Sequence, residues 1–399
     1  MGDNIHRHFS LCDMPGMKGD GKGGIAGSCS CCVLLFGMDP RDPSLLPGKR
    51  VRARGVGSNV AGRFEGHRVE AAFDGWDVTE EERLLRTEVR TERARSAITW
   101  QRSPDLPFDR SVNPYRGCEH GCVYCFARPS HAFLNLSPGL DFETRLIARP
   151  GIDGVLAEEL RKPGYMVAPM AIGTNTDPYQ PIEAEYGVMR AVLQVLHDFG
   201  HPVFVTTRGA LVERDIDLLA AMAGRGLAVV SVSVTTLDAG LARKMEPRAP
   251  SPARRLGMIR ALTGAGIPVR VQVSPLIPAL TDHELEAVLE AAAAAGATFA
   301  SAIPLRLPLE VAGLFRAWVE HHFPDRAARV MGRVRELHGG RDYDPAFGVR
   351  MTGQGVWADL HRKRMVIARA RYGLAVGMPA LRRDLFSPPG RAGDQLSLF

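Results

Sequence analysis

From Ser111 onward, short apolar runs alternate with longer amphipathic stretches along the chain. A repeated rhythm of strand and helix predicts βαβ units, and such units join into a parallel sheet. The pattern therefore predicts an α/β fold. The six expected strands are SVNPY (111–115), MVAPMAIG (166–173), PVFVTT (202–207), AVVSVSVT (228–235), IPVRVQVSP (267–275) and ATFASAIP (297–304).

Three amphipathic stretches predict helices between these strands: residues 182–199, 211–224 and 281–296. The third begins at Thr281 with Glu284 three residues later, which predicts a capping box at its N-terminus. Gly296 predicts the C-terminal end of the same helix, because glycine readily adopts the left-handed conformation that often follows a helix.

Composition divides the chain into five segments. Residues 1–45 are expected to be a disordered leader, or the product of a gene start placed too early with Met38 as the true initiator. The cysteines of this segment match no metal-ligand spacing. The other segments are an arginine-rich N-terminal extension (46–106), the core (107–308), a helical C-terminal region (309–385) and a flexible tail (386–399). The arginine-rich arm either packs on the core, touches a phosphate backbone or is a solvated surface.

Charge and hydropathy narrow the class of partner. The formal net charge of +6 and the pI near 9.0 permit a polyanionic partner such as nucleic acid. The 45% of hydrophobic residues is ample for a buried core. No run of about 18 apolar residues is present, so no membrane span is expected.

Three cysteines in the stretch NPYRGCEHGCVYCFARP carry the strongest chemical signal. Cys118, Cys122 and Cys125 have the spacing C-x3-C-x2-C, and no cysteine follows them. Three such thiolates suit a [4Fe-4S] cluster whose fourth iron remains open to a ligand, which predicts a reaction centre. A zinc site is the alternative, but it would need a fourth ligand, and His120 lies at an unusual spacing. A disulfide would leave one thiol over. An oxygen-sensitive cluster and free thiols indicate the reducing cytoplasm.

The cysteine spacing is that of the radical S-adenosylmethionine (SAM) superfamily, which the chain resembles here. Further stretches resemble the spore photoproduct lyase-like branch: GRFE (62–65), PFDRSVNPYRGCEHGCVYCFARPSHAF (107–133), LSPGLDFET (136–144), GTNTDPYQPIE (173–183), ERDIDLL (213–219) and EPRAPSP (246–252). The resemblance implies an open (β/α)6 partial TIM barrel with the cysteine loop after its first strand. It also implies a [4Fe-4S] cluster and SAM as cofactors, an external reductant, and cleavage of SAM to a 5′-deoxyadenosyl radical.

Candidate SAM ligands lie where the expected strands end, which is where parallel barrels gather their reacting groups. They are Gly173, Thr174, Asn175 and Asp177 after the second strand, Arg208 after the third and Ser233 on the fourth. Gly173 would let the backbone approach the methionyl amine, Arg208 would clamp the carboxylate and Ser233 would hydrogen-bond it. In the lyases a lysine and a serine at the positions of Arg208 and Ser233 hold that carboxylate. The alternative for each polar residue is a turn or a helix cap.

The resemblance does not carry the lyase reaction with it. Those lyases return a hydrogen atom from a cysteine downstream of the cluster, and they place tyrosines on both sides of the last cluster cysteine. Here Tyr124 is present and is the candidate catalytic residue, but the second position is Phe126. We therefore expect a neighbouring subgroup that acts on DNA in repair. The alternatives are radical modification of RNA or another macromolecule, and a non-enzymatic iron–sulfur module.

Two C-terminal features suggest nucleic-acid contact. Basic residues between 350 and 371 lie near Trp357 and Tyr372 and would grip a strand by phosphate contact and stacking, or would form a solvated helix face. The chain ends in QLSLF, which resembles the bacterial sliding-clamp-binding motif. Gln395, Leu396, Leu398 and Phe399 are the expected clamp contacts, and a tail that packs on its own domain is the alternative.

Overall fold

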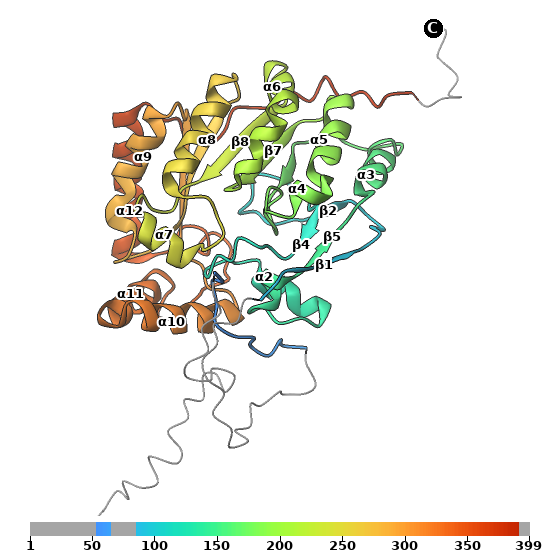
Figure 1. Cartoon of the computed structure of the whole chain (residues 1–399). Coiled ribbons are helices and arrows are strands. Elements are labelled where there is room, and N and C mark those ends of the chain that lie inside the picture. The colour runs from blue at the N-terminus through green and yellow to red at the C-terminus, as the bar shows by residue number, and fades with distance from the viewer. Residues whose placement is uncertain (1–52, 65–84, 391–399) are drawn as a thin grey trace, which may run out of the picture. The chain divides into compact units, whose positions relative to one another are not determined.

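Six parallel strands form the central sheet in the computed structural model of the chain, which describes residues 53–64 and 85–390 (Figure 1). In spatial order they are β3 (Arg110–Val112), β6 (Met170–Ile172), β7 (Val203–Thr207), β8 (Ala228–Ser233), β9 (Val269–Leu276) and β10 (Phe299–Pro304). Strand β2 (Ile98–Trp100) pairs antiparallel with β3 at one edge. Each parallel strand lies beside the next in the chain, and the sheet of the described residues does not close. The predicted open partial barrel is confirmed.

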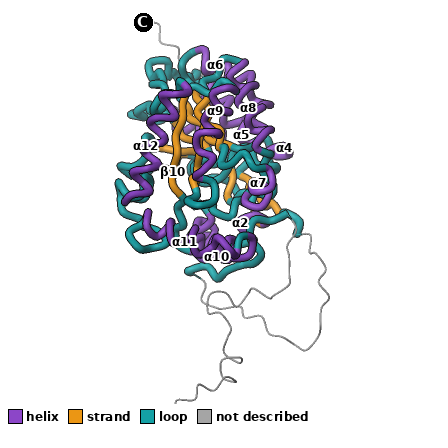
Figure 2. The backbone as a smooth tube through the Cα atoms, turned by 90° about the vertical axis from the view of Figure 1, so that its left-hand side faces the viewer, coloured by secondary structure: helices purple, strands orange, loops and turns teal. Residues whose placement is uncertain are grey.

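Helices cover one face of this sheet (Figure 2), and the valines on that face are buried beneath them. Val205, Val230 and Val271 have no exposed surface. The covering helices are α3 (Ile152–Leu160), α5 (Val188–Asp198), α6 (Ile216–Gly224), α8 (Pro252–Gly264), α9 (Leu285–Ala294) and α12 (Gly355–Tyr372). Shorter elements are α2 (Asp141–Thr144), α4 (Glu183–Tyr186), α7 (Ala239–Met245) and the 3₁₀ helices η1 (Arg128–Leu134), η2 (Ala210–Asp215) and η3 (Asp282–Glu284). In the described part of the chain, no helix is long and apolar enough to span a bilayer.

Three helix predictions need correction. The stretch 211–224 begins within the 3₁₀ helix η2 and continues as α6. The stretch 182–199 forms two helices, α4 and α5, because Gly187 between them has a φ of +61°. The capping box is wrong: Glu284 accepts hydrogen bonds from Thr236 Oγ1 at 2.8 Å and from the Leu237 amide at 2.6 Å, so it anchors another loop. Gly296, with a φ of +100°, does follow the end of α9 as predicted.

The predicted helical C-terminal region serves two purposes. Helices α10 (Glu310–His322) and α11 (Pro324–Leu337) share a hydrophobic cluster with Cys122, Val123 and Tyr124 of the cysteine loop. Helix α12 instead packs on α9 and β10, at the end of the central sheet. The first pair therefore supports the cysteine loop, whereas α12 completes the layer of helices.

A small second sheet and the N-terminal arm flank the cysteine loop. The sheet has the order β1 (Glu88–Thr91), β5 (Arg145–Ala148) and β4 (Tyr115–Arg116), and β4 leads directly into the loop. The arm, residues 53–64, packs on the same region. The predicted leader and the QLSLF tail lie outside the described residues.

Candidate active site

The cysteine loop is fixed by backbone hydrogen bonds to elements far away in the sequence. The Cys118 amide donates to the Phe142 carbonyl at 2.9 Å, and the Val123 amide donates to the Met245 carbonyl at 3.0 Å. Cys118 and Cys122 are buried, Cys125 is half-buried, and all three are free thiols. The loop thus presents three thiols from a backbone anchored at both α2 and the end of α7.

The thiols fit a cluster better than a single metal ion. Within residues 53–64 and 85–390, no three His, Cys, Asp or Glu side chains converge as a single-ion site requires. A cubane takes one thiolate on each of three irons, so its ligands need not meet at one point. Burial raises the pKa of Cys122 to about 12, although the charge of Arg208 acts to lower it. The free thiol is therefore protonated at neutral pH, and it must release a proton when it binds a metal.

A buried ion pair supports the cysteine loop. Arg128 and Glu143 are fully buried and pair through Arg128 Nη2 and Glu143 Oε1. Arg128 also donates from Nε to the Cys122 carbonyl at 3.0 Å, and Glu143 accepts from the Gly55 amide at 2.9 Å. The pair therefore ties the loop to η1, α2 and the N-terminal arm at once.

Arg208 follows β7 and reaches the cysteine loop. Its Nη1 lies 2.8 Å from Cys122 Sγ, 2.8 Å from the Tyr124 hydroxyl and 3.0 Å from Glu246 Oε1. The described residues offer no side-chain partner to its Nε and Nη2, and the side chain is 17% exposed. These two N–H groups have the fork geometry that matches a carboxylate. Arg208 therefore fits its predicted role at the carboxylate of SAM.

Asp177 is committed to internal contacts. It accepts from Thr207 Oγ1 at 2.6 Å and from the Arg208 amide at 2.9 Å, and it lies 3.4 Å from His120 Nδ1. Burial alone would raise the pKa of Asp177, but the nearby His120 ring and the hydrogen bonds from Thr207 and the Arg208 amide lower it to about 2. We interpret Asp177 as a positioning residue for Arg208 and the cysteine loop, rather than as a SAM ligand.

The remaining predicted SAM residues lie at the same end of the sheet. Gly173 has a φ of +87°, and a Cβ there would lie 2.0 Å from the Thr206 carbonyl oxygen, so only glycine fits beside β7. Asn113 Oδ1 accepts from the Asn175 amide at 3.1 Å and from Thr174 Oγ1 at 3.4 Å. Ser233 is 4% exposed on β8. A role for these residues in SAM binding stays a prediction.

Sequence reasoning missed a buried carboxylate beside Tyr124. Glu246 accepts hydrogen bonds from the hydroxyls of Tyr124 and Thr235 and pairs with both Arg208 and Arg255. Burial opposes its ionisation, but the two arginines lower the pKa of Glu246 to about 2. Glu246 is the first residue of EPRAPSP (246–252), a stretch that resembles the family but for which the sequence predicted no chemical role. Burial raises the pKa of Tyr124, so the phenol keeps its proton.

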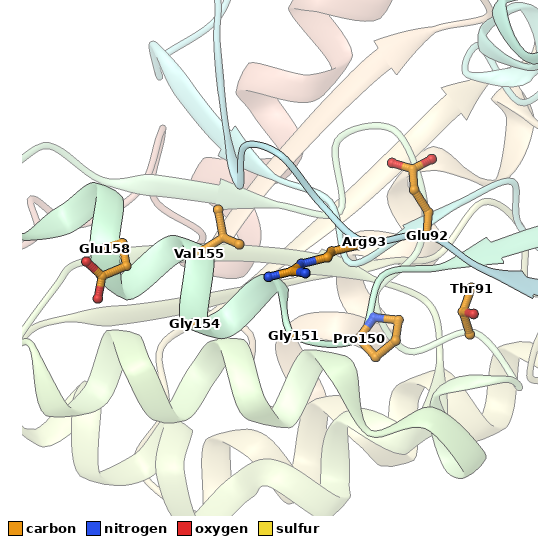
Figure 3. A pocket seen from close by; sticks show the side chains of 8 residues that line it. All are labelled: Thr91, Glu92, Arg93, Pro150, Gly151, Gly154, Val155 and Glu158. Atoms are coloured by element: carbon orange, nitrogen blue, oxygen red, sulfur yellow. The ribbon is translucent and has the colours of Figure 1, made fainter.

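The described residues form one pocket beside this site and another that is distant from it. One of about 440 Å³ reaches His120 on the cysteine loop, beside Arg243, Arg248 and Arg254. Another of about 570 Å³ lies between β1 and the start of α3, with Arg93 beside the helix (Figure 3). The second contains none of the cysteines or predicted SAM-binding residues, and it does not belong to the candidate site.

Comparison with known proteins agrees with this geometry. Residues 112–292 match the radical SAM superfamily. An uncharacterized protein of Mycobacterium tuberculosis is 37% identical over 272 residues, which are 68% of this chain and 76% of the relative. One from Methanocaldococcus jannaschii is 25% identical over 173 residues, which are 43% of this chain and 62% of the relative.

Solved structures with the same fold include a mutant of spore photoproduct lyase. It superposes with a TM-score of 0.52 at 15% identity and covers 72% of this chain and 81% of its own. The same enzyme complexed with dinucleoside spore photoproduct gives a TM-score of 0.50 at 15% identity over the same shares of both chains.

The chain belongs to the radical SAM superfamily. Members of this superfamily use a [4Fe-4S] cluster and SAM, so the cluster predicted by the cysteine spacing and the SAM implied by the resemblance are confirmed. The likeness to spore photoproduct lyase is one of fold.

Proposed function

We propose that this enzyme binds one [4Fe-4S] cluster on Cys118, Cys122 and Cys125 and cleaves SAM to a 5′-deoxyadenosyl radical. The observation that supports this most directly is that Arg208 lies beside Cys122 while its Nε and Nη2 have no side-chain partner among the described residues. When bound, the cluster supplies the electron that breaks the carbon–sulfur bond of SAM. Arg208 holds the SAM carboxylate next to the cluster loop, and Ser233 donates a second hydrogen bond to it.

Tyr124 and Glu246 shape the wall of this site. The Tyr124 phenol is held by Glu246 and Thr235 and contacts the same Arg208 nitrogen that reaches Cys122. Glu246 thereby orients both the phenol and the guanidinium. Because the phenol remains protonated, we propose that Tyr124 acts as a neutral hydrogen-bonding group near the reacting atoms.

The test is formation of 5′-deoxyadenosine by anaerobically reconstituted protein with SAM and dithionite. We expect turnover with the wild type and none with Cys118→Ala, which loses a cluster ligand. If protein with a full iron and sulfide content leaves SAM intact, the proposal is wrong.

We propose DNA as the substrate, in a repair reaction. Support comes from the net charge of +6 and from the related fold that binds a dinucleoside photoproduct. The basic surface is smaller than the sequence suggested, because Arg364 pairs with Glu286 and Arg350 pairs with Asp105. Reversal of a thymine dimer through a cysteine relay is not proposed, since no cysteine follows Cys125.

Isotope transfer distinguishes DNA from RNA. Deuterated single-stranded DNA and RNA of matched sequence would be incubated with the loaded enzyme and SAM, and the 5′-deoxyadenosine analysed by mass spectrometry. Deuterium from DNA alone supports the proposal. Deuterium from RNA alone identifies the alternative substrate.

We further propose that the tail recruits the enzyme to the sliding clamp in the cytoplasm. The support is the QLSLF sequence alone, because Gln395, Leu396, Leu398 and Phe399 lie outside the described residues. Pull-down with the clamp should lose binding in a Leu398→Ala and Phe399→Ala double variant, and equal binding would discard the motif. Clamp binding without any SAM turnover would instead identify a non-enzymatic module.

A further inference from the structure

The face of the central sheet opposite the helices carries polar side chains on β8, β9 and β10. Along β9, side chains alternate between buried and half-buried, and the buried Val269, Val271 and Val273 belong to the core under the helices. Successive side chains of a strand point to opposite faces, so Arg270 and Gln272 lie on the other face. We call this second surface the inner face.

Strand register aligns polar side chains in two layers of the inner face, and the first layer also contains Phe299 of β10 opposite Arg270. One layer aligns Ser231 of β8 with Arg270 of β9. The next layer aligns Ser233, Gln272 and Ser301 across β8, β9 and β10. Interiors of closed parallel barrels are filled mainly by branched apolar side chains, so polar layers here indicate a binding surface rather than a packed core.

Arg270 lacks a counter-ion on this face. Its Nε donates to Ser231 Oγ at 2.9 Å, and it takes part in none of the ion pairs among residues 53–64 and 85–390. Burial lowers the pKa of Arg270 to about 10, so the guanidinium stays charged at neutral pH. A partly buried cation without a counter-ion is costly, which favours an anionic ligand over a neutral one.

Gln272, two residues further on the same face, has an unused acceptor. Its Oε1 is buried and has no hydrogen-bond partner in the described part of the chain. Buried polar atoms in folded proteins are nearly always satisfied, and an unsatisfied one calls for a ligand or water. Gln272 also aligns with Ser233, the proposed SAM contact, so the subsite lies within one layer of the reaction centre.

We infer that Arg270 and Gln272 form a substrate subsite on the inner face, in which Arg270 binds an oxyanion and Gln272 accepts an N–H or O–H of the same molecule. This inference rests on the proposed function for its chemistry. For a nucleic-acid substrate, the oxyanion is a phosphate and the donor is a base or sugar group. Four guanidinium N–H donors of Arg270 remain for the phosphate oxygens.

The test compares thymidine with thymidine 5′-monophosphate, which differ only in the phosphate. Binding to the anaerobic, cluster-loaded enzyme with SAM is measured by calorimetry, with inorganic phosphate as a third probe. We expect the monophosphate to bind at least about tenfold more tightly than thymidine. Arg270→Gln should remove that difference, and Arg270→Lys should retain part of it. Arg260→Gln, a change of an exposed arginine on α8, should leave it intact.

Gln272→Glu is a second test that does not depend on whether Arg270→Gln folds. It places a carboxylate two residues from Arg270 on the same face. This carboxylate would pair with the guanidinium, so thymidine 5′-monophosphate should no longer bind more tightly than thymidine. Three results would overturn the subsite. The wild type could bind thymidine and thymidine 5′-monophosphate with equal affinity, it could bind neither, or Arg270→Gln and Gln272→Glu could keep the preference of the wild type. SAM cleavage by the wild type is read separately, so failure of the proposed function is distinguished from failure of this inference.

Discussion

The guanidinium of Arg208 lies 2.8 Å from the sulfur of Cys122, although 86 residues separate them in the chain. Asp177 fixes this contact by binding the Arg208 amide, and Glu246 fixes it by pairing with the guanidinium. A cation at this position would compensate the negative charge of a thiolate-ligated cluster. The Nε and Nη2 of Arg208 would remain available to the SAM carboxylate. If Arg208 binds SAM as proposed, this one side chain links the cluster loop to the SAM carboxylate.

Arg208→Gln should weaken SAM binding about 10- to 100-fold, because a charge-assisted hydrogen bond contributes about 1.5–3 kcal/mol. Arg208→Lys should lie between this variant and the wild type, since it keeps the charge and loses the fork. Equilibrium binding of SAM to cluster-loaded protein measures both. Arg254→Gln alters an exposed arginine paired with Glu213 and is the control. Unchanged SAM affinity in Arg208→Gln would refute the assignment.

Glu246→Gln should destabilise the fold strongly. The change keeps the shape of the side chain but leaves Arg255, whose side chain is 2% exposed, without its counter-ion. Breaking a buried ion pair by removing one partner costs about 3–5 kcal/mol. The free energy of unfolding in urea measures this. Glu213→Gln breaks the exposed pair with Arg254 and should cost no more than about 1 kcal/mol. Similar costs for the two variants would contradict the buried network.

The sequence predicts the sheet well because its signal is local. Each strand is a short apolar run, and each helix has its own periodicity, so each of the six parallel strands overlaps an expected one. The first match is partial, because β3 ends at Val112 and Tyr115 belongs to β4 of the small second sheet. The cysteine ligands are equally local, within eight residues of each other. Glu284 shows the limit: its spacing from Thr281 suits a cap, but a hydrogen bond to Thr236, 48 residues away, is formed instead.

The supporting residues of the site are not local and escaped prediction. Tyr124 and Glu246 are 122 residues apart, and His120 of the cysteine loop lies beside Asp177, which follows β6 in the chain. A single sequence does not reveal which glutamate will be buried between two arginines. The same applies to Arg270, whose significance depends on the absence of a carboxylate on neighbouring strands of the described sheet.

Stability should fall as the pH drops below 6.5, partly because of His201. Burial lowers the pKa of this fully buried histidine to about 4, and its ring contacts the Tyr165 hydroxyl at 2.8 Å. The unfolded chain therefore binds a proton at a pH where the folded chain does not, and stability is lost on acidification.

The loss from His201 is about 1 kcal/mol between pH 7.5 and 5.5 and approaches about 3 kcal/mol near pH 4. Urea unfolding of the wild type and His201→Asn at pH 7.5 and 5.5 measures the difference. The variant should show the smaller pH dependence. His283→Asn, at a position 69% exposed, should keep the slope of the wild type. Equal slopes in the wild type and His201→Asn would exclude this contribution.

Gly55→Ala should impair cluster loading, although Gly55 is no ligand. A Cβ at this position would lie 1.6 Å from the Gly121 carbonyl oxygen, so the N-terminal arm or the cysteine loop must move. Gly57→Ala is a matched control two residues away, because a Cβ there meets nothing within 4 Å. Iron per chain and the visible absorption of the reconstituted cluster are the measurements. We expect the Gly55 variant to retain less than about half of the iron of the Gly57 variant, because displacement of backbone by this distance exceeds what a packed loop absorbs. Equal loading would show that the arm packs beside the loop without holding it, and that the hydrogen bonds of the loop to Phe142, Met245 and Arg128 are sufficient to hold it.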